Sequence, residues 1–208
     1  VMSGAETARV GGRDWSKKQC YTAVLRLDPN DALAWNDLGA VMSGAETARV
    51  GGRDWSKKEC YTEALRIDPY CALTWRNLGA VMSGAETARV GGRDWSKKEC
   101  YIEALRIDPN YAFAWRSLGA VMSGAETARV GGRDWSKKQC YTAVLRLDPN
   151  DALAWNDLGF VMSGAETARV GGWDWSKKEC YIEALRLDPD LKSATSNLAA
   201  LDHGCAVS

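Results

Sequence analysis

One block of sequence recurs every 40 residues, and this period constrains the fold more than any other feature of the chain. The block Val-Met-Ser-Gly-Ala-Glu-Thr-Ala-Arg-Val-Gly-Gly begins, unchanged, at residues 1, 41, 81, 121 and 161 of the 208. Segments 1–40 and 121–160 differ only at Ala40 and Phe160. A fixed period of about 20 to 50 residues is typical of stacked supersecondary units, so we expect a repeat protein.

Each repeat is predicted to contain two helices and no strand. An Asp-Pro pair separates neighbouring helices, because proline disfavours helix at the preceding residue and fits the first turn of a new one. The first helix is expected over about 31–50, with apolar residues three and four apart and Gly51-Gly52 as its stop. The second begins at Asp54 or Ser56 with a Ser-x-x-Glu capping box. Since no stretch alternates apolar and polar residues over strand length, the pattern favours an all-α fold.

Both helices carry a recurring motif, Trp-x-x-Leu-Gly in the first and Tyr-x-x-Ala-Leu-x-x-Asp-Pro in the second. In the first full copy these residues are Trp35, Leu38, Gly39, Tyr61, Ala64, Leu65, Asp68 and Pro69. The pattern resembles the tetratricopeptide repeat (TPR), which implies an α-α superhelix, or solenoid, of stacked antiparallel helix pairs. The period of that family is about 34 residues, so about six are extra here. The composition Ala-Glu-Thr-Ala-Arg favours a longer first helix for them over a loop.

The same frame divides the chain, which we expect to form one solenoid over residues 1–208. Its predicted segments are a partial leading repeat at 1–30, four full helix pairs at 31–70, 71–110, 111–150 and 151–190, and a terminal capping helix and tail at 191–208. Because the chain opens inside a first-type helix, we expect a fragment of a longer array. The last helix has Thr195 for tryptophan and Ala199 for glycine, as expected of a cap that ends an apolar face. The tryptophans, one in every 20 residues, are predicted to pack structurally.

Composition argues against several partners. Lysine plus arginine and aspartate plus glutamate number 27 each, so the formal net charge is zero. Such a chain has no bulk attraction to nucleic acid or to anionic lipid, and we expect neither as a partner. Its apolar runs are too short for a membrane-spanning helix. The basic residues near the turn between the helices alternate with acidic ones, which predicts a solvated surface of mixed charge.

No catalytic constellation is found, so we expect no enzyme activity, no catalytic or metal-binding residue and no cofactor. Five cysteines repeat at 40-residue spacing, namely Cys20, Cys60, Cys100, Cys140 and Cys180, and Cys71 and Cys205 are extra. Equivalent positions in stacked repeats lie on the order of 10 Å apart, beyond the roughly 7 Å limit for a disulfide. Reduced thiols predict a cytoplasmic location. The single histidine, His203, supports neither a zinc site nor a base for a thiol nucleophile.

The resemblance to TPR proteins also implies a site, a concave groove lined by the first helices in which a peptide or partner segment binds. Carried over by position, the candidate ligand-groove residues are Asn36, Leu73, Arg76, Phe113, Arg116, Asn156 and Phe160, beside Leu33, Ala40, Ala80, Ala120 and Leu153. The copies diverge at several of these positions, as ligand contacts would. Two arginines on adjacent repeats predict that the peptide is acidic, because guanidinium groups bind carboxylates in a fork.

Other interpretations stay open at this point. The chain could be a structural array that associates with itself head to tail, a near-identical antigenic repeat, or an accessory domain of a larger enzyme. Separately, the last full copy has Phe160 for alanine and Trp173 for arginine. These two large apolar residues could pack together or form a contact patch.

Overall fold

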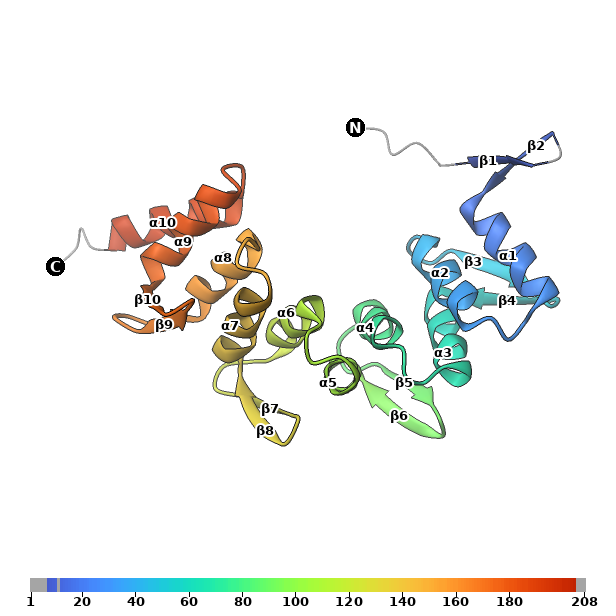
Figure 1. Ribbon diagram of the computed structural model, residues 1–208, viewed down its shortest axis with the longest axis horizontal. Coiled ribbons are helices and arrows are strands. Elements are labelled where there is room, and N and C mark those ends of the chain that lie inside the picture. Colours follow the sequence, from blue (N-terminus) through green and yellow to red (C-terminus); the bar gives the residue numbers. More distant parts are fainter. Residues whose placement is uncertain (1–6, 11, 205–208) are drawn as a thin grey trace. The chain divides into compact units, whose positions relative to one another are not determined.

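The chain folds as a mixed α/β repeat, in which a two-stranded hairpin separates the two helices of each repeat (Figure 1). A computed structural model describes residues 7–10 and 12–204. The expected all-α superhelix is therefore wrong, because strands are part of every repeat. The start of the expected leading repeat, residues 1–6, and the tail from Cys205 onward lie outside the described residues.

We call the helix before each hairpin the A helix and the helix after it the B helix. The A helices are α2 (Ala32–Val41), α4 (Ala72–Val81), α6 (Ala112–Val121) and α8 (Ala152–Val161), and α10 (Lys192–Gly204) occupies the A position of the last repeat. The B helices are α1 (Lys17–Leu27), α3 (Lys57–Ile67), α5 (Lys97–Ile107), α7 (Lys137–Leu147) and α9 (Lys177–Leu187).

Five antiparallel hairpins occur within the described residues, one before each B helix. They are β1–β2 (Thr7–Val10 and Arg13–Ser16), β3–β4 (Thr47–Val50 and Arg53–Ser56), β5–β6 (Thr87–Val90 and Arg93–Ser96), β7–β8 (Thr127–Val130 and Arg133–Ser136) and β9–β10 (Thr167–Val170 and Trp173–Ser176).

The A helix is shorter than the 31–50 expected from sequence, because a glycine turn ends it. In the first full copy the helix ends at Val41, and Met42 is already extended. Gly44 then has a φ of 53°, a conformation that residues with a side chain rarely adopt. Glu46 closes this turn, since its amide donates to the Ser43 carbonyl and its carboxylate accepts from the Ser43 amide at 3.1 Å.

The extra residues form the hairpin. Gly51 and Gly52 have φ angles of 59° and 82°, the positive pair that a two-residue type I′ turn requires. The turn pairs Val50 with Arg53, and it places Thr47 opposite Ser56. Ala48 and Val50 are buried while the residues between them are exposed, so the first strand has the alternation of a half-buried sheet.

The start of the B helix follows the sequence prediction. Ser56 is the N-cap of α3, its hydroxyl accepts from the Glu59 amide, and the Glu59 carboxylate accepts from the Ser56 amide at 2.8 Å. This capping box is confirmed. The hydrogen bonds from Ser56, followed by those from Arg53, lower the pKa of Glu59 against the effect of burial.

A pair of tryptophans joins each of the last four hairpins to the A helix before it. The ring centroids of Trp35 and Trp55 lie 4.5 Å apart, and the indole nitrogen of Trp55 donates to the Val50 carbonyl at 3.2 Å. Only 2% of Trp35 is exposed, so the predicted structural role of this residue is confirmed. On the other side of the A helix, a Cβ placed on Gly39 would lie 2.8 Å from the Tyr61 ring, so the motif glycine lets the B helix approach.

The hairpins β3–β4, β5–β6 and β9–β10 are also held by the B helix of the preceding repeat. Lys58 of α3 forms an ion pair with Glu86, and its ammonium donates to the Thr87 carbonyl at 3.2 Å. Lys138 of α7 pairs with Glu166 in the same way. The helices α3 and α7 therefore contact the strands β5 and β9 of the next repeat.

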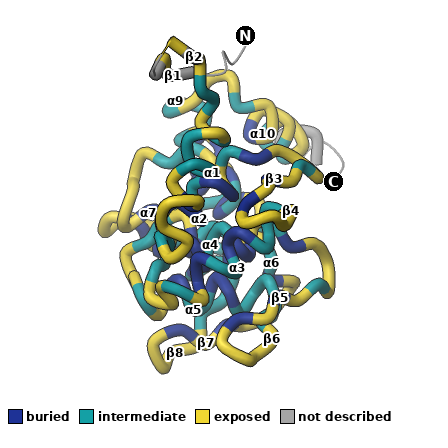
Figure 2. Tube along the Cα trace, turned by 90° about the vertical axis from the view of Figure 1, so that its right-hand side faces the viewer, coloured by how far each residue is buried: buried dark blue, intermediate teal, exposed yellow. Residues whose placement is uncertain are grey.

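The structure forms two compact units, one ending at Ile107 and the other beginning at Asp108. The first contains α1 to α5, and the second contains α6 to α10. Each has its own buried core, formed by residues of the helices and of the first strand of the hairpins, while the hairpin tips are exposed (Figure 2).

Replacing Gly84 tests the hairpin directly. Gly84 has a φ of 51°, so Gly84→Ala should lower the free energy of unfolding by about 1 kcal/mol. If the A helix continued through this residue, the same change would instead stabilise the chain by about 1 kcal/mol. Urea unfolding followed by circular dichroism gives the sign. Gly84→Asn is the matched control and should cost less, because asparagine tolerates positive φ.

Candidate binding face of the A helices

The second unit exposes large apolar side chains on one face of its A helices. Phe113 of α6 is 60% exposed, and Leu153 and Phe160 of α8 are 39% and 64% exposed. Leu153 and Phe160 are seven residues apart, which places them on the same face of the helix, two turns from each other. We call Phe113, Leu153 and Phe160 the apolar face. Where exposed apolar residues form a contiguous patch, the patch marks an interaction surface.

The first unit has a weaker version of this surface. Leu33 of α2 and Leu73 of α4 are 66% and 44% exposed, and Ala40 and Ala80 are exposed seven residues after them. Alanine stands at the position equivalent to Phe160 in the first unit, so this surface offers a ligand less apolar area than the surface of the second unit does.

Two of the predicted groove residues are buried. Asn36 is 2% exposed and Asn156 is 6% exposed. The side-chain oxygen of Asn36 accepts from the Thr74 hydroxyl at 3.2 Å and from the Asn77 amide at 3.1 Å. These contacts join α2 to α4, so the residue connects successive A helices and leaves almost no surface for a ligand.

Asn156 repeats this contact in the second unit. Its oxygen accepts from the Asn197 amide of α10 at 3.0 Å, across the same 41-residue separation. Sequence reasoning missed this role, although one signal was present: where Asn36 and Asn156 stand, an asparagine also stands 41 residues later.

Arg116 occupies the equivalent position of α6 and pairs with two carboxylates, one at the N-cap of α8 and one within α8. Its guanidinium lies 3.8 Å from Asp151 and 3.7 Å from Asp157. Burial raises the pKa of Asp157, and the positive charge of Arg116 opposes that rise. This arginine is therefore already engaged inside the unit, and it is only 31% exposed.

Arg76 of α4 is half-buried and differently placed. Its Nε is buried without a hydrogen-bond partner, while another guanidinium nitrogen lies 3.4 Å from the Asn77 side-chain oxygen. No carboxylate of the described residues lies within ion-pair distance of it. Arg76 belongs to the first unit and Arg116 to the second.

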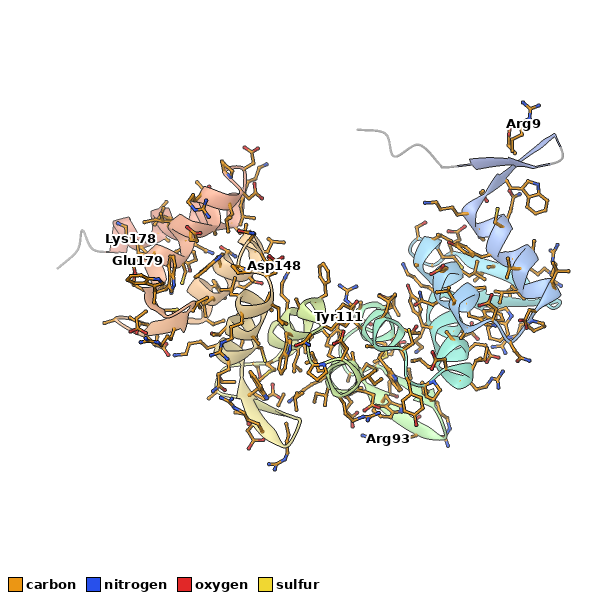
Figure 3. The ribbon with its side chains drawn as sticks, viewed as in Figure 1. Arg9, Arg93, Tyr111, Asp148, Lys178 and Glu179 are labelled. Carbon is orange, nitrogen blue, oxygen red and sulfur yellow. The ribbon has the colours of Figure 1, made fainter. Side chains whose placement is uncertain are left out.

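The hairpins present the predicted surface of mixed charge. Arg49 pairs with Asp54 at 3.4 Å, and Arg53 pairs with Glu59. Arg93, labelled on β6 in Figure 3, lies 4.2 Å over the Trp95 ring and pairs with Glu99. Exposed ion pairs of this kind contribute little to stability. Because the carboxylates balance the charge of the arginines, the hairpins attract a polyanion only weakly.

Trp173 replaces the stacking arginine in the last hairpin. It is 75% exposed, and in the described residues no ring contact joins it to Phe160. The suggested packing of these two residues is not observed, and Trp173 stands as a separate exposed aromatic on β10.

The cysteines near the start of α3, α5, α7 and α9 are fully buried. Burial raises the pKa of Cys60, Cys100, Cys140 and Cys180 to about 12, so these thiols stay protonated at neutral pH. No group of three or more His, Cys, Asp or Glu side chains within residues 7–10 and 12–204 is arranged to hold a metal ion. Over the same residues, no helix has the length and hydropathy needed to cross a membrane.

Comparison with known protein families finds none that matches this chain, and comparison with curated proteins finds no match either. The resemblance to TPR proteins therefore rests on the motif residues alone.

Removing Arg116 should destabilise the fold, because its carboxylate partners would be left without a neighbouring positive charge. We expect Arg116→Gln to lower the free energy of unfolding by about 1–2 kcal/mol at neutral pH. Loss of the guanidinium raises the pKa of Asp157 further. A carboxyl whose pKa is higher in the folded state than in the unfolded state binds more protons in the folded state. Stability therefore falls as the pH rises from the unfolded-state pKa to the folded-state pKa. The difference in stability between Arg116→Gln and the wild-type chain should therefore decrease as the pH is lowered to about 4.

Thermal unfolding at pH 7 and pH 4 measures this effect, with Arg76→Gln as the matched control. Because Arg76 has no carboxylate partner within the described residues, its replacement should cost less and depend little on pH. Equal losses for the two variants at both pH values would contradict the assignment.

The thiols provide a second test. In a Cys205→Ser chain at pH 8, Cys20 and Cys71, which are half-buried, should react with a disulfide reagent well before the four buried thiols. The buried four should react only on unfolding, because their pKa is high and the reagent has no access. Absorbance traces with six equal rates would rule out this burial pattern.

Proposed function

We propose that the chain is a non-catalytic protein-interaction scaffold of TPR-like repeats that binds a peptide or partner segment on the exposed faces of its A helices. The observation that carries the proposal is the exposure of Phe113, Leu153 and Phe160 on two adjacent A helices of the second unit. Each phenylalanine offers on the order of 100 Å² of apolar surface for a ligand to bury.

The chemistry of this face favours an apolar anchor over an acidic one. Arg116 lies between Phe113 and Ala120 on the helix, but its charge is balanced by Asp151 and Asp157. An incoming carboxylate would have to displace those partners. For the second unit we therefore propose a ligand that presents aromatic or aliphatic side chains.

An acidic ligand remains part of the proposal for the first unit alone. Arg76 keeps a guanidinium without a carboxylate partner in the described residues, and it lies three residues from Leu73 on the same helix. A carboxylate could bind this group while an apolar neighbour contacts Leu73.

The surroundings of the buried thiols and of the repeating carboxylates support a binding role. The buried thiols have pKa values far from neutrality, and the carboxylates that repeat along the chain serve as caps and ion-pair partners. Free cysteines also suit a reducing compartment, so we propose a cytoplasmic location.

The chain itself supplies the variants that test the apolar face. Other copies carry leucine at the position of Phe113 and alanine at that of Phe160, so Phe113→Leu and Phe160→Ala should both fold. Peptides selected from a displayed random library on the full chain should bind the double variant about tenfold more weakly, because aromatic residues dominate such contacts.

Trp173→Arg is the matched control, since it also removes one exposed aromatic and restores the residue of the other copies. Fluorescence anisotropy with the selected peptides compares the variants. Binding that tolerates the double variant but is lost with Trp173→Arg would move the site to the last hairpin and refute the proposal.

A further inference from the structure

The hairpin β9–β10 differs from its counterpart β3–β4 at a single residue. Segments 41–61 and 161–181 have the same sequence except at Arg53 and Trp173. The two segments therefore compare an arginine with a tryptophan at one position of the same local fold. Differences in the contacts made within the repeat at this position come from the residue that occupies it.

In three copies a guanidinium group lies over the ring of the hairpin tryptophan. The central guanidinium carbon of Arg53 is 4.3 Å from the ring centroid of Trp55. The same contact measures 4.2 Å for Arg93 and 4.7 Å for Arg133. A positive charge over an indole is attracted by the negative face of the ring, so the hairpin provides a favourable position for a guanidinium group.

The same guanidinium also pairs with a carboxylate at the start of the B helix. Arg53 pairs with Glu59, and Arg93 pairs with Glu99. Each of these glutamates uses its two oxygens differently. Oε1 accepts from the arginine, whereas Oε2 accepts from the amide and the hydroxyl of the N-cap serine. The ring and Oε1 together bind one guanidinium group.

In the last copy the ring and the carboxylate remain, but the arginine is replaced. Glu179, labelled at the start of α9 in Figure 3, accepts through Oε2 from the Ser176 amide at 2.7 Å and from its hydroxyl at 2.6 Å. Within the described residues no arginine pairs with Glu179 or lies over the Trp175 ring. Trp173 does not substitute for the guanidinium by stacking, since no ring contact joins it to Trp175 in the same part of the chain.

The spacing of the two tryptophans suits a planar group between them. Trp173 and Trp175 are two residues apart on one face of β10, which separates them by about 7 Å along the strand. Atoms in van der Waals contact lie roughly 3.5–4.0 Å apart, so a flat group in contact with both rings needs about that spacing. The position is also open to solvent, because Trp173 is 75% exposed and the side chains of Arg53 and Arg93 are 60% and 59% exposed.

We propose that Trp173, Trp175 and Glu179 form a binding site for an arginine side chain of a partner protein. We call these three residues the arginine site. The guanidinium group would stack on Trp175, donate to Oε1 of Glu179 and be covered by Trp173. Lysine is a poorer ligand, because its ammonium group is a compact point charge and does not stack. The arginine site is separate from the apolar face and binds a ligand of different chemistry.

The probe that tests the arginine site is N-acetyl-arginine methylamide, added to the full chain. Saturation-transfer difference NMR detects weak binding from the signals of the probe itself, and a titration gives the dissociation constant. Binding should saturate. N-acetyl-citrulline methylamide has nearly the same shape but no charge, and it should bind about tenfold more weakly because it lacks the cation–π attraction and the charge-assisted hydrogen bond.

The other copies supply variants that should fold. Trp173→Arg restores the residue of those copies, and its own guanidinium should fill the arginine site, so that the probe no longer binds. Glu179→Gln should weaken binding about tenfold through loss of the negative charge. Gln139 stands at this position in another copy and keeps the capping box there, so the helix start is preserved. Circular dichroism checks the fold of each variant.

Tyr70→Asn is the matched control, because it removes an exposed aromatic residue of the first unit and introduces the asparagine of other copies. It should leave binding of the probe unchanged. Any of four results would overturn the proposal: no saturable binding, equal binding of the citrulline compound, undiminished binding by Trp173→Arg, or tighter binding of N-acetyl-trimethyllysine methylamide than of the arginine probe. The last result would assign the two indoles to a methylated lysine instead.

Discussion

The contact between two indoles holds each repeat together. In four successive repeats a tryptophan of the A helix lies 4.3 to 4.5 Å, centroid to centroid, from a tryptophan of the following hairpin. The hairpin has only four residues in each strand, too few for an isolated two-stranded sheet to be stable in water. Burial of these rings against the A helix, with the lysine of the preceding B helix on the strand, keeps it folded. The position of the B helix then follows, because it starts at the end of the second strand.

The sequence predicts the B helix well and the A helix only in part. Ser56 and Glu59 are local signals, and they act within one turn. The hairpin was missed because its alternation spans only four residues and because a glycine pair signals a helix stop as well as a type I′ turn. Ala-Glu-Thr-Ala-Arg favours a helix in isolation, but the indole contact and the positive φ of Gly44 override that propensity.

The candidate site was predicted to the same mixed extent. The exposed positions of Phe113 and Phe160 follow from helical spacing, which a single sequence provides. The burial of Asn36 does not, because it depends on a second A helix that packs against it and supplies an amide from 41 residues away. Divergence between copies therefore has two sources here: some variable residues face solvent, and others face the neighbouring repeat.

Two kinds of contact join successive repeats, and they differ in whether one copy can replace another at the contact. The lysine and glutamate that tie a B helix to the next hairpin recur in every full copy, so any copy could follow any other at that joint. The contact between A helices is different, because Arg116 needs aspartates in the copy that follows it. In another copy Asn77 stands at the position of Asp157. Recombination that placed that copy after Arg116 would remove this carboxylate partner of the half-buried guanidinium. The contacts between A helices thus constrain which copy can follow which, even where the repeats are otherwise interchangeable.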